Sequence, residues 1–116
     1  MFEHLSILQK EALARLALSI VGLQTDGHIR TCDPVVFGLF VDFFGTLSQE
    51  DILPLLAEIT RMDSKAATSV ASNLDNDTKC RFKYYMQDLL GREDSRTLFA
   101  LAIVLQKIGL QVPNQS

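Results

Sequence analysis

The sequence predicts an all-α fold, a compact bundle of about five to six helices. Apolar residues recur at steps of three and four along most of the chain, which is the spacing of one helix face. Residues that favour helix starts, and glycines that favour helix ends, divide the chain into such stretches. No run of alternating apolar and polar residues between turn residues, the pattern of a strand, is present. These three observations indicate helices joined by short loops.

The first predicted helix begins near Leu5 and ends at the turn formed by residues 25–27. Its wide apolar stripe includes Leu5, Leu8, Ala12, Leu16 and Leu23. Asp33 and Pro34 then supply an N-cap residue and a first-turn proline for a second helix over residues 35–45. Only Gly38 and Asp42 interrupt the apolar residues of that helix. A helix that is apolar on every side is buried all round or lies in an interface.

Three further helices and a last apolar one complete the pattern. Residues 48–51 resemble a capping box and open a helix that carries apolar residues from Ile52 to Ile59. Residues 63–74 are weakly amphipathic, and a turn at residues 75–77 opens a helix that ends at Gly91. The last helix, over residues 95–108, is again apolar nearly all round and is followed by Gly109. Residues 1–112 are therefore expected to form one domain, with a flexible tail at residues 113–116.

The two halves of the chain are similar at an offset of 64 residues. Gly27 then falls on Gly91 and Gly45 on Gly109. This match favours an internal pseudo-twofold repeat, in which the two apolar helices pack against each other, although any two amphipathic helices share a period. Asp42, if it is buried, needs a partner. Gln106, its counterpart at this offset, is the expected one.

Composition and motifs exclude several classes of function. A net charge of −3 and a pI near 5.2 disfavour nucleic-acid binding. The longest apolar runs have eight residues, whereas a membrane-spanning helix needs roughly 20. The N-terminus does not resemble a secretory signal, so a cytoplasmic location is expected. His28 and Cys32 share one loop, but neither zinc spacing nor a base for a cysteine nucleophile accompanies them. The chain is therefore expected not to be an enzyme.

The loop from Thr25 to Asp33 resembles that of the bacterial tellurite-resistance TerB-like family. The shared pattern is an acidic residue, glycine, any residue, isoleucine, and a second acidic residue seven places after the first. The resemblance implies an all-α fold with two helix–loop–helix halves, a role in stress response, and a Ca²⁺ or Mg²⁺ ion held by Asp26 and Asp33. The second half departs from the pattern, with Leu90 and Thr97 at the acidic positions. Turn formation by Asp26 and N-capping by Asp33 account for the two acids without a bound ion, and this is the favoured interpretation.

The leading interpretation is a helical interaction module that binds a protein partner or forms a homodimer. The apolar surplus motivates it, because an apolar helix that its own chain covers on one side leaves the other side for a partner. The expected interface residues are Phe37, Phe40, Phe44, Asp42 and Tyr84. Tyr84 also belongs to a possible aromatic–basic patch with Lys79, Arg81 and Lys83. In the alternative, Tyr85 and Met86 pack in the core and the three basic residues form a solvated face.

The cation hypothesis makes a direct prediction. If Asp26 and Asp33 hold a divalent ion, titration with Ca²⁺ or Mg²⁺ releases measurable heat in calorimetry. The ion also raises the melting temperature, because a ligand that binds the native state stabilises it. Zn²⁺ serves as the comparison ion. No heat and no change in melting temperature at millimolar concentrations of all three ions would remove the hypothesis.

Overall fold

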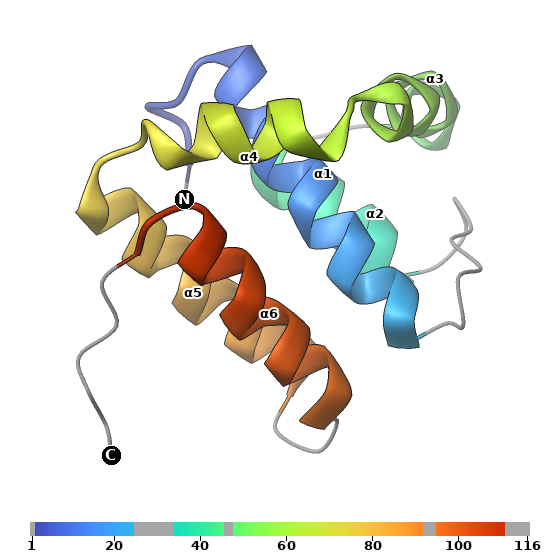
Figure 1. The fold of residues 1–116 in the computed structure, drawn as a ribbon. Coiled ribbons are helices and arrows are strands. Elements are labelled where there is room, and N and C mark those ends of the chain that lie inside the picture. The colour runs from blue at the N-terminus through green and yellow to red at the C-terminus, as the bar shows by residue number, and fades with distance from the viewer. Residues whose placement is uncertain (1, 25–33, 46–47, 92–94, 111–116) are drawn as a thin grey trace.

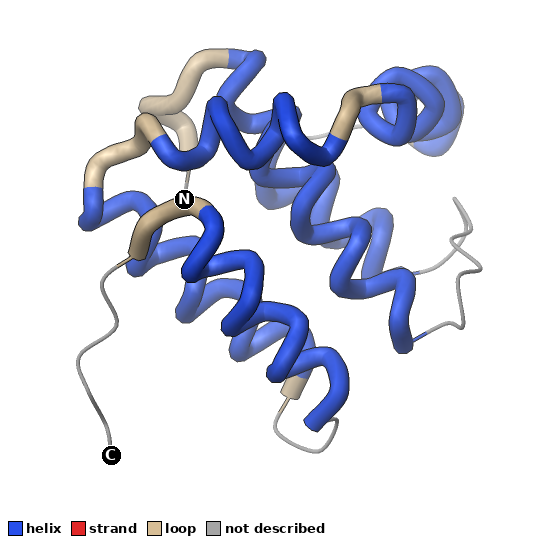
Figure 2. Tube along the Cα trace, in the orientation of Figure 1, coloured by secondary structure: helices blue, strands red, loops and turns tan. Residues whose placement is uncertain are grey.

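The computed structural model describes residues 2–24, 34–45, 48–91 and 95–110. Figure 2 shows that these residues form helices and connecting loops, without a strand. The helices are α1 (Ile7–Gln24), α2 (Pro34–Phe44), α3 (Gln49–Arg61), α4 (Ser64–Ser72), α5 (Asn76–Leu90) and α6 (Ser95–Lys107). Among these helices, none combines the length and apolar character that crossing a membrane requires. The predicted all-α bundle of five to six helices is confirmed.

Helix α1 lies at the centre of the fold and contacts each of the other five helices (Figure 1). Most of its middle is buried, and only the side that carries Arg15 and Ser19, one turn apart, is half-buried or exposed. These buried residues are Ala12, Leu13, Ala14, Leu16, Ala17, Leu18, Ile20 and Val21. A wide apolar stripe suits a helix that packs against several neighbours. Residues 35–45 and 95–108 were the segments expected to be buried all round or in an interface, whereas α1 is the helix that contacts all the others.

Helix α4 makes the most extensive contact with α1. Its buried residues are Ala67 and Ala71, one turn apart, and such small side chains allow two helix axes to approach closely. The turn between α3 and α4 is fixed to α1 by a side chain, because Nε of Arg15 donates a hydrogen bond of 3.0 Å to the carbonyl oxygen of Met62. The alanine-rich stretch with weak amphipathicity is therefore a structural contact of the central helix.

An aromatic cluster joins α2, α5 and the residues before α1. The Phe2 ring stacks on Phe43 of α2, with centroids 4.7 Å apart and planes 9° from parallel. Tyr85 of α5 meets both rings edge-on, at 5.9 Å from Phe2 and 5.6 Å from Phe43. The Tyr85 hydroxyl donates a hydrogen bond of 2.8 Å to Oδ2 of Asp42. Burial, and then this hydrogen bond and the charge of Asp42, raises the pKa of Tyr85, so the hydroxyl keeps its proton.

One packing expectation is wrong. Helices α2 and α6 do not form an extended contact with each other, because each packs against α1 instead. Asp42 is exposed, so the condition under which Gln106 was expected as its partner does not hold, and its carboxylate accepts a hydrogen bond from Tyr85 instead. An internal repeat would place the two apolar helices against each other. They do not pack in this way because α1 lies where that contact was expected. The repeat itself stays a prediction.

A glycine ends α6, and a buried lysine lies beside it. Gly109 has a φ of +84°, and the N–H of Leu110 bonds back to the carbonyl oxygen of Leu105 at 3.0 Å, as in a Schellman motif. A Cβ at Gly109 would lie 3.6 Å from Nζ of Lys79. That amine donates a hydrogen bond of 3.0 Å to the carbonyl oxygen of Ser72, at the end of α4. Lys79 is only 8% exposed, so the expected solvated face is wrong for this residue.

The predicted caps of α3 and α5 are confirmed. The Asp51 carboxylate accepts hydrogen bonds from the backbone N–H and the hydroxyl of Ser48, at 3.4 and 2.9 Å. The Asp75 carboxylate accepts from the backbone N–H of Thr78 at 2.9 Å. Hydrogen bonding to Thr78 is the main cause that lowers the pKa of Asp75. These caps begin the two helices at the residues that the sequence indicated.

The hydrogen bond between Tyr85 and Asp42 is expected to stabilise the fold by about 1 kcal/mol. We expect Tyr85→Phe to lower the free energy of unfolding by this amount. Asp42→Ala should lower it similarly, and the double variant no more than either single one. Tyr84→Phe is the matched control and should change the free energy by less than about 0.5 kcal/mol, because Tyr84 is exposed. Denaturant unfolding measures all four; additive losses from Tyr85→Phe and Asp42→Ala would contradict the assignment.

Glu11 of α1 generates a pH-dependent prediction. Burial, and then the negative charge of Glu58 on α3, raises the pKa of Glu11. The fold therefore favours the neutral carboxyl, and this contribution to stability is lost as pH rises through the folded-state pKa. We expect Glu11→Gln to increase stability at neutral pH, by less than about 0.5 kcal/mol because solvent screens the partly exposed pair. The gain should vanish below about pH 4. Thermal unfolding at both pH values checks this, and a loss of stability at neutral pH would refute it.

Candidate functional site

The outer side of α6 presents apolar side chains to solvent. Phe99 is 68% exposed and Ile103 is 37% exposed, and they lie one turn apart. Ala102 and Gln106 are also exposed and lie on the same side of the helix. We call these four residues the α6 face. In Figure 1, α6 lies in front of α5, and none of the helices that the structure describes covers its outer side.

The opposite side of α6 is firmly packed. Thr97, Leu101 and Leu105 are buried, and Ile108 beyond the last turn is fully buried. The helix contacts α1 and α5 along its length and also contacts α4. Because the inner residues hold the helix in the core, the exposure of Phe99 and Ile103 does not result from a poorly packed helix. It results from apolar residues placed on the solvent side.

A pocket lies between α5 and the start of α6. It has a volume of about 490 Å³ and is lined by Tyr84, Gln87, Asp88, Gly91 and Leu98. We call it the Tyr84 pocket. Tyr84 is 60% exposed, and Nζ of Lys83 lies 5.3 Å from the centroid of its ring. Leu98 lies one turn before Ala102, so the pocket borders the α6 face along one edge.

Other exposed apolar residues do not form a comparable surface. Leu53 on α3 is 62% exposed, and a single exposed leucine is ordinary on a protein surface. Ile7 and Leu8 begin α1, and as consecutive residues they point about 100° apart. The α6 face differs because its apolar residues share one side of a helix and adjoin a pocket.

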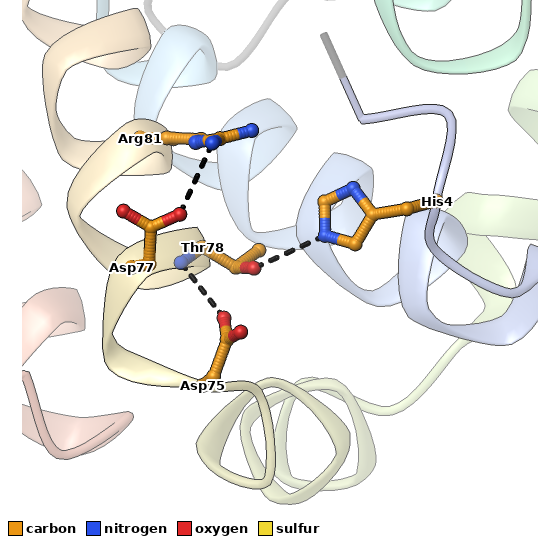
Figure 3. Close-up of polar contacts among 5 residues, drawn as sticks. All are labelled: His4, Asp75, Asp77, Thr78 and Arg81. Carbon is orange, nitrogen blue, oxygen red and sulfur yellow. Dashed lines mark hydrogen bonds and ion pairs between the residues drawn. The ribbon is translucent and has the colours of Figure 1, made fainter.

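A polar cluster at the start of α5 has a structural role. Figure 3 shows that His4 approaches Thr78 from one side, with its Nε2 3.2 Å from the Thr78 hydroxyl oxygen. Asp75 lies on another side of Thr78 and accepts from its backbone N–H. The Asp75 carboxylate therefore does not orient the imidazole, as a nucleophile–base–acid relay requires. Asp77 pairs with Arg81 at 3.2 Å, one turn along the same helix. The cluster caps α5 and ties the N-terminal residues to it.

The residues that were expected to form the interface do not lie together on one surface. Phe40 is fully buried, and its ring belongs to the core. Phe37 and Phe44 are half-buried and pack against the core. Asp42 is exposed and bonds to Tyr85. Only Tyr84 lies in a pocket, and the structure does not bring it together with the phenylalanines of α2 on one surface.

The expected cation ligands, Asp26 and Asp33, lie outside the described residues, as do His28 and Cys32. Within the part of the chain that the structure describes, no three His, Cys, Asp or Glu residues lie close enough together to hold a metal ion. The proposed cation site at Asp26 and Asp33 therefore stays a prediction.

Phe99 and Ile103 are the surface residues that sequence reasoning missed. The signal was present, because residues 95–108 are apolar nearly all round although one side of the helix faces solvent. The pattern showed a surplus of apolar residues on two helices, but it did not show which one had an uncovered side. Burial by α1 decides this, and it is a property of the folded chain.

Comparisons with known proteins do not place the chain in a family. Protein-family models, curated proteins and solved structures all gave no match. The resemblance of the loop from Thr25 to Asp33 to the TerB-like family remains a prediction, and its residues lie outside the described part of the chain. The function is therefore argued from the surface of α5 and α6.

Proposed function

We propose that this protein is a non-enzymatic helical interaction module that binds a protein partner through the α6 face and the Tyr84 pocket. One observation carries the proposal: Phe99 and Ile103 are exposed one turn apart on a helix whose other side is fixed in the core. Contiguous exposed apolar residues characterise binding surfaces, because exposing them to water is unfavourable.

The composition of the surface supports binding to a protein. Aromatic residues are enriched at the centres of protein interfaces, and truncating such a residue often weakens binding strongly. The surface has two of them, Phe99 and Tyr84. Gln87 and Asp88 line the pocket and Gln106 lies on the α6 face, so polar groups accompany the apolar ones, as they do in protein interfaces. The pocket beside the α6 face accommodates a side chain of the partner.

Substitution at the centre of the surface tests the proposal. We expect Phe99→Asp to abolish capture of a protein partner from a native lysate, because it places a charge among apolar contacts. Leu53→Asp is the matched control, since Leu53 is about as exposed but lies on α3. Both variants should keep the wild-type melting temperature, because surface changes usually alter stability by less than about 0.5 kcal/mol.

The outcome is read from the difference between the two variants. A protein captured by the wild type and by Leu53→Asp, but not by Phe99→Asp, supports the α6 face. Equal capture by all three chains would contradict it. Sedimentation of the purified wild type at micromolar concentration tests self-association, and a dimer that Phe99→Asp dissociates would identify a homodimer as the partner.

A further inference from the structure

We infer that the Tyr84 pocket holds a basic side chain, lysine or arginine, of the protein partner; this inference rests on the proposed function and specifies the partner's chemistry. The main evidence is the charge at the end of α5. Asp88 lies in the last turn of α5, and that turn contains no basic residue. The C-terminal end of a helix carries a partial negative charge, which repels a carboxylate and attracts a cation. Asp88 is therefore unfavourably placed in the free protein and favourably placed for binding a cation.

No basic side chain in the described part of the chain neutralises Asp88. Asp88 is exposed, and its carboxylate forms no hydrogen bond or ion pair with a described residue. Arg81, about two turns earlier on α5, pairs with Asp77 at 3.2 Å instead. Residues 92–94, which follow α5 in the sequence, comprise one basic and two acidic residues, so they add no net positive charge. The carboxylate is thus available to a cation from another protein.

The ring of Tyr84 supplies a surface that attracts cations. Tyr84 is 60% exposed, and Nζ of Lys83 lies 5.3 Å from the ring centroid, within the range of a cation–π contact. Lys83 uses the ring alone, because it forms no ion pair with Asp88. A basic side chain in the pocket can pack its methylene groups on the ring and on Leu98 while its charge meets Asp88. The side-chain oxygen of Gln87 offers a second acceptor.

A second pocket helps to identify which side of Tyr84 suits a cation. This pocket has a volume of about 400 Å³ and is lined by Arg81, Tyr84, Tyr85 and Asp88. The guanidinium of Arg81 repels another cation there. Among the described residues that line the Tyr84 pocket, by contrast, Asp88 is the only charged one. The Tyr84 pocket is therefore the place where a cation meets an unopposed carboxylate.

Two other kinds of side chain fit the pocket less well. An acidic side chain would meet the charge of Asp88 and the negative end of α5. An apolar side chain would remove water from the Asp88 carboxylate without supplying a partner, and this desolvation is costly. A basic side chain supplies that partner and also covers the exposed ring of Tyr84. Both other kinds of side chain are outcomes of the test.

NMR spectroscopy of the full-length protein, labelled with ¹⁵N, tests the inference with three short peptides. The first is acetylated and amidated Leu-Arg-Leu, the second has citrulline, the uncharged analogue, in place of arginine, and the third has glutamate there. The arginine peptide should shift the amide signals of Gln87, Asp88 and Gly91, and added salt should weaken its binding. The citrulline peptide should bind about fivefold more weakly, because it loses a charge-assisted hydrogen bond. The glutamate peptide should not bind.

Matched variants identify the groups that hold the cation. Asp88→Asn should weaken binding of the arginine peptide to the level of the citrulline peptide. Glu58→Gln, an exposed change on α3 with the same effect on net charge, should leave binding unchanged. Tyr84→Leu should weaken binding and Tyr84→Phe should retain it, because the ring face contacts the cation. Asp88→Asn should melt no lower than the wild type, since it removes an unfavourable charge from the end of α5.

The results separate the inference from the proposed function. Equal binding of the arginine and citrulline peptides, or equal effects of Asp88→Asn and Glu58→Gln, would overturn the basic side chain as the occupant. Binding of the glutamate peptide would overturn it as well. A partner that is captured from lysate in a Phe99-dependent manner, and equally well by Asp88→Asn, would refute the inference and leave the proposed function intact.

Discussion

The contact of α1 with its neighbours is the constraint on which the other helices depend. Each of them contacts α1, and the most extensive contact is made by α4 through Ala67 and Ala71. Three alanines in the middle of α1, Ala12, Ala14 and Ala17, are fully buried. Larger side chains there would separate the surrounding helices, and overpacking of this kind typically costs about 1–3 kcal/mol. The alternation of alanine with leucine and isoleucine lets α1 pack against several neighbouring helices.

The surface of the molecule follows from this arrangement. Because α1 fills the centre, α2 and α6 lie on the outside of it and each is covered on one side. The aromatic cluster covers part of the remaining surface of α2, because Phe43 packs against Phe2 and Tyr85. No helix covers α6 in the same way, and Phe99 and Ile103 remain exposed. The asymmetry between two similar helices produces the candidate binding surface.

The sequence predicts local structure well and relative burial poorly. The helix ends at Ser48, Asp75 and Gly109 were predicted correctly, because a cap depends on residues within one turn of the helix end. The identity of the central helix was not predictable from periodicity, since α1 has a wide apolar stripe with Glu11, Arg15 and Ser19 on the other side, as an ordinary surface helix has. The partner of Asp42 was missed because Tyr85 is 43 residues away and on another helix. For the same reason the composition of α6 indicated an interface without indicating which of its residues face solvent.

Hydroxyl-radical footprinting of the free protein tests the central claim, that α6 exposes an apolar face while the helices pack on α1. The seven phenylalanines share one intrinsic reactivity, so their modification rates report exposure directly. The structure predicts rapid modification of Phe99 in the folded protein, whereas Phe40 and Phe43 become modified only when the protein unfolds. Protection of Phe99 to the same degree as Phe40 would contradict the claim.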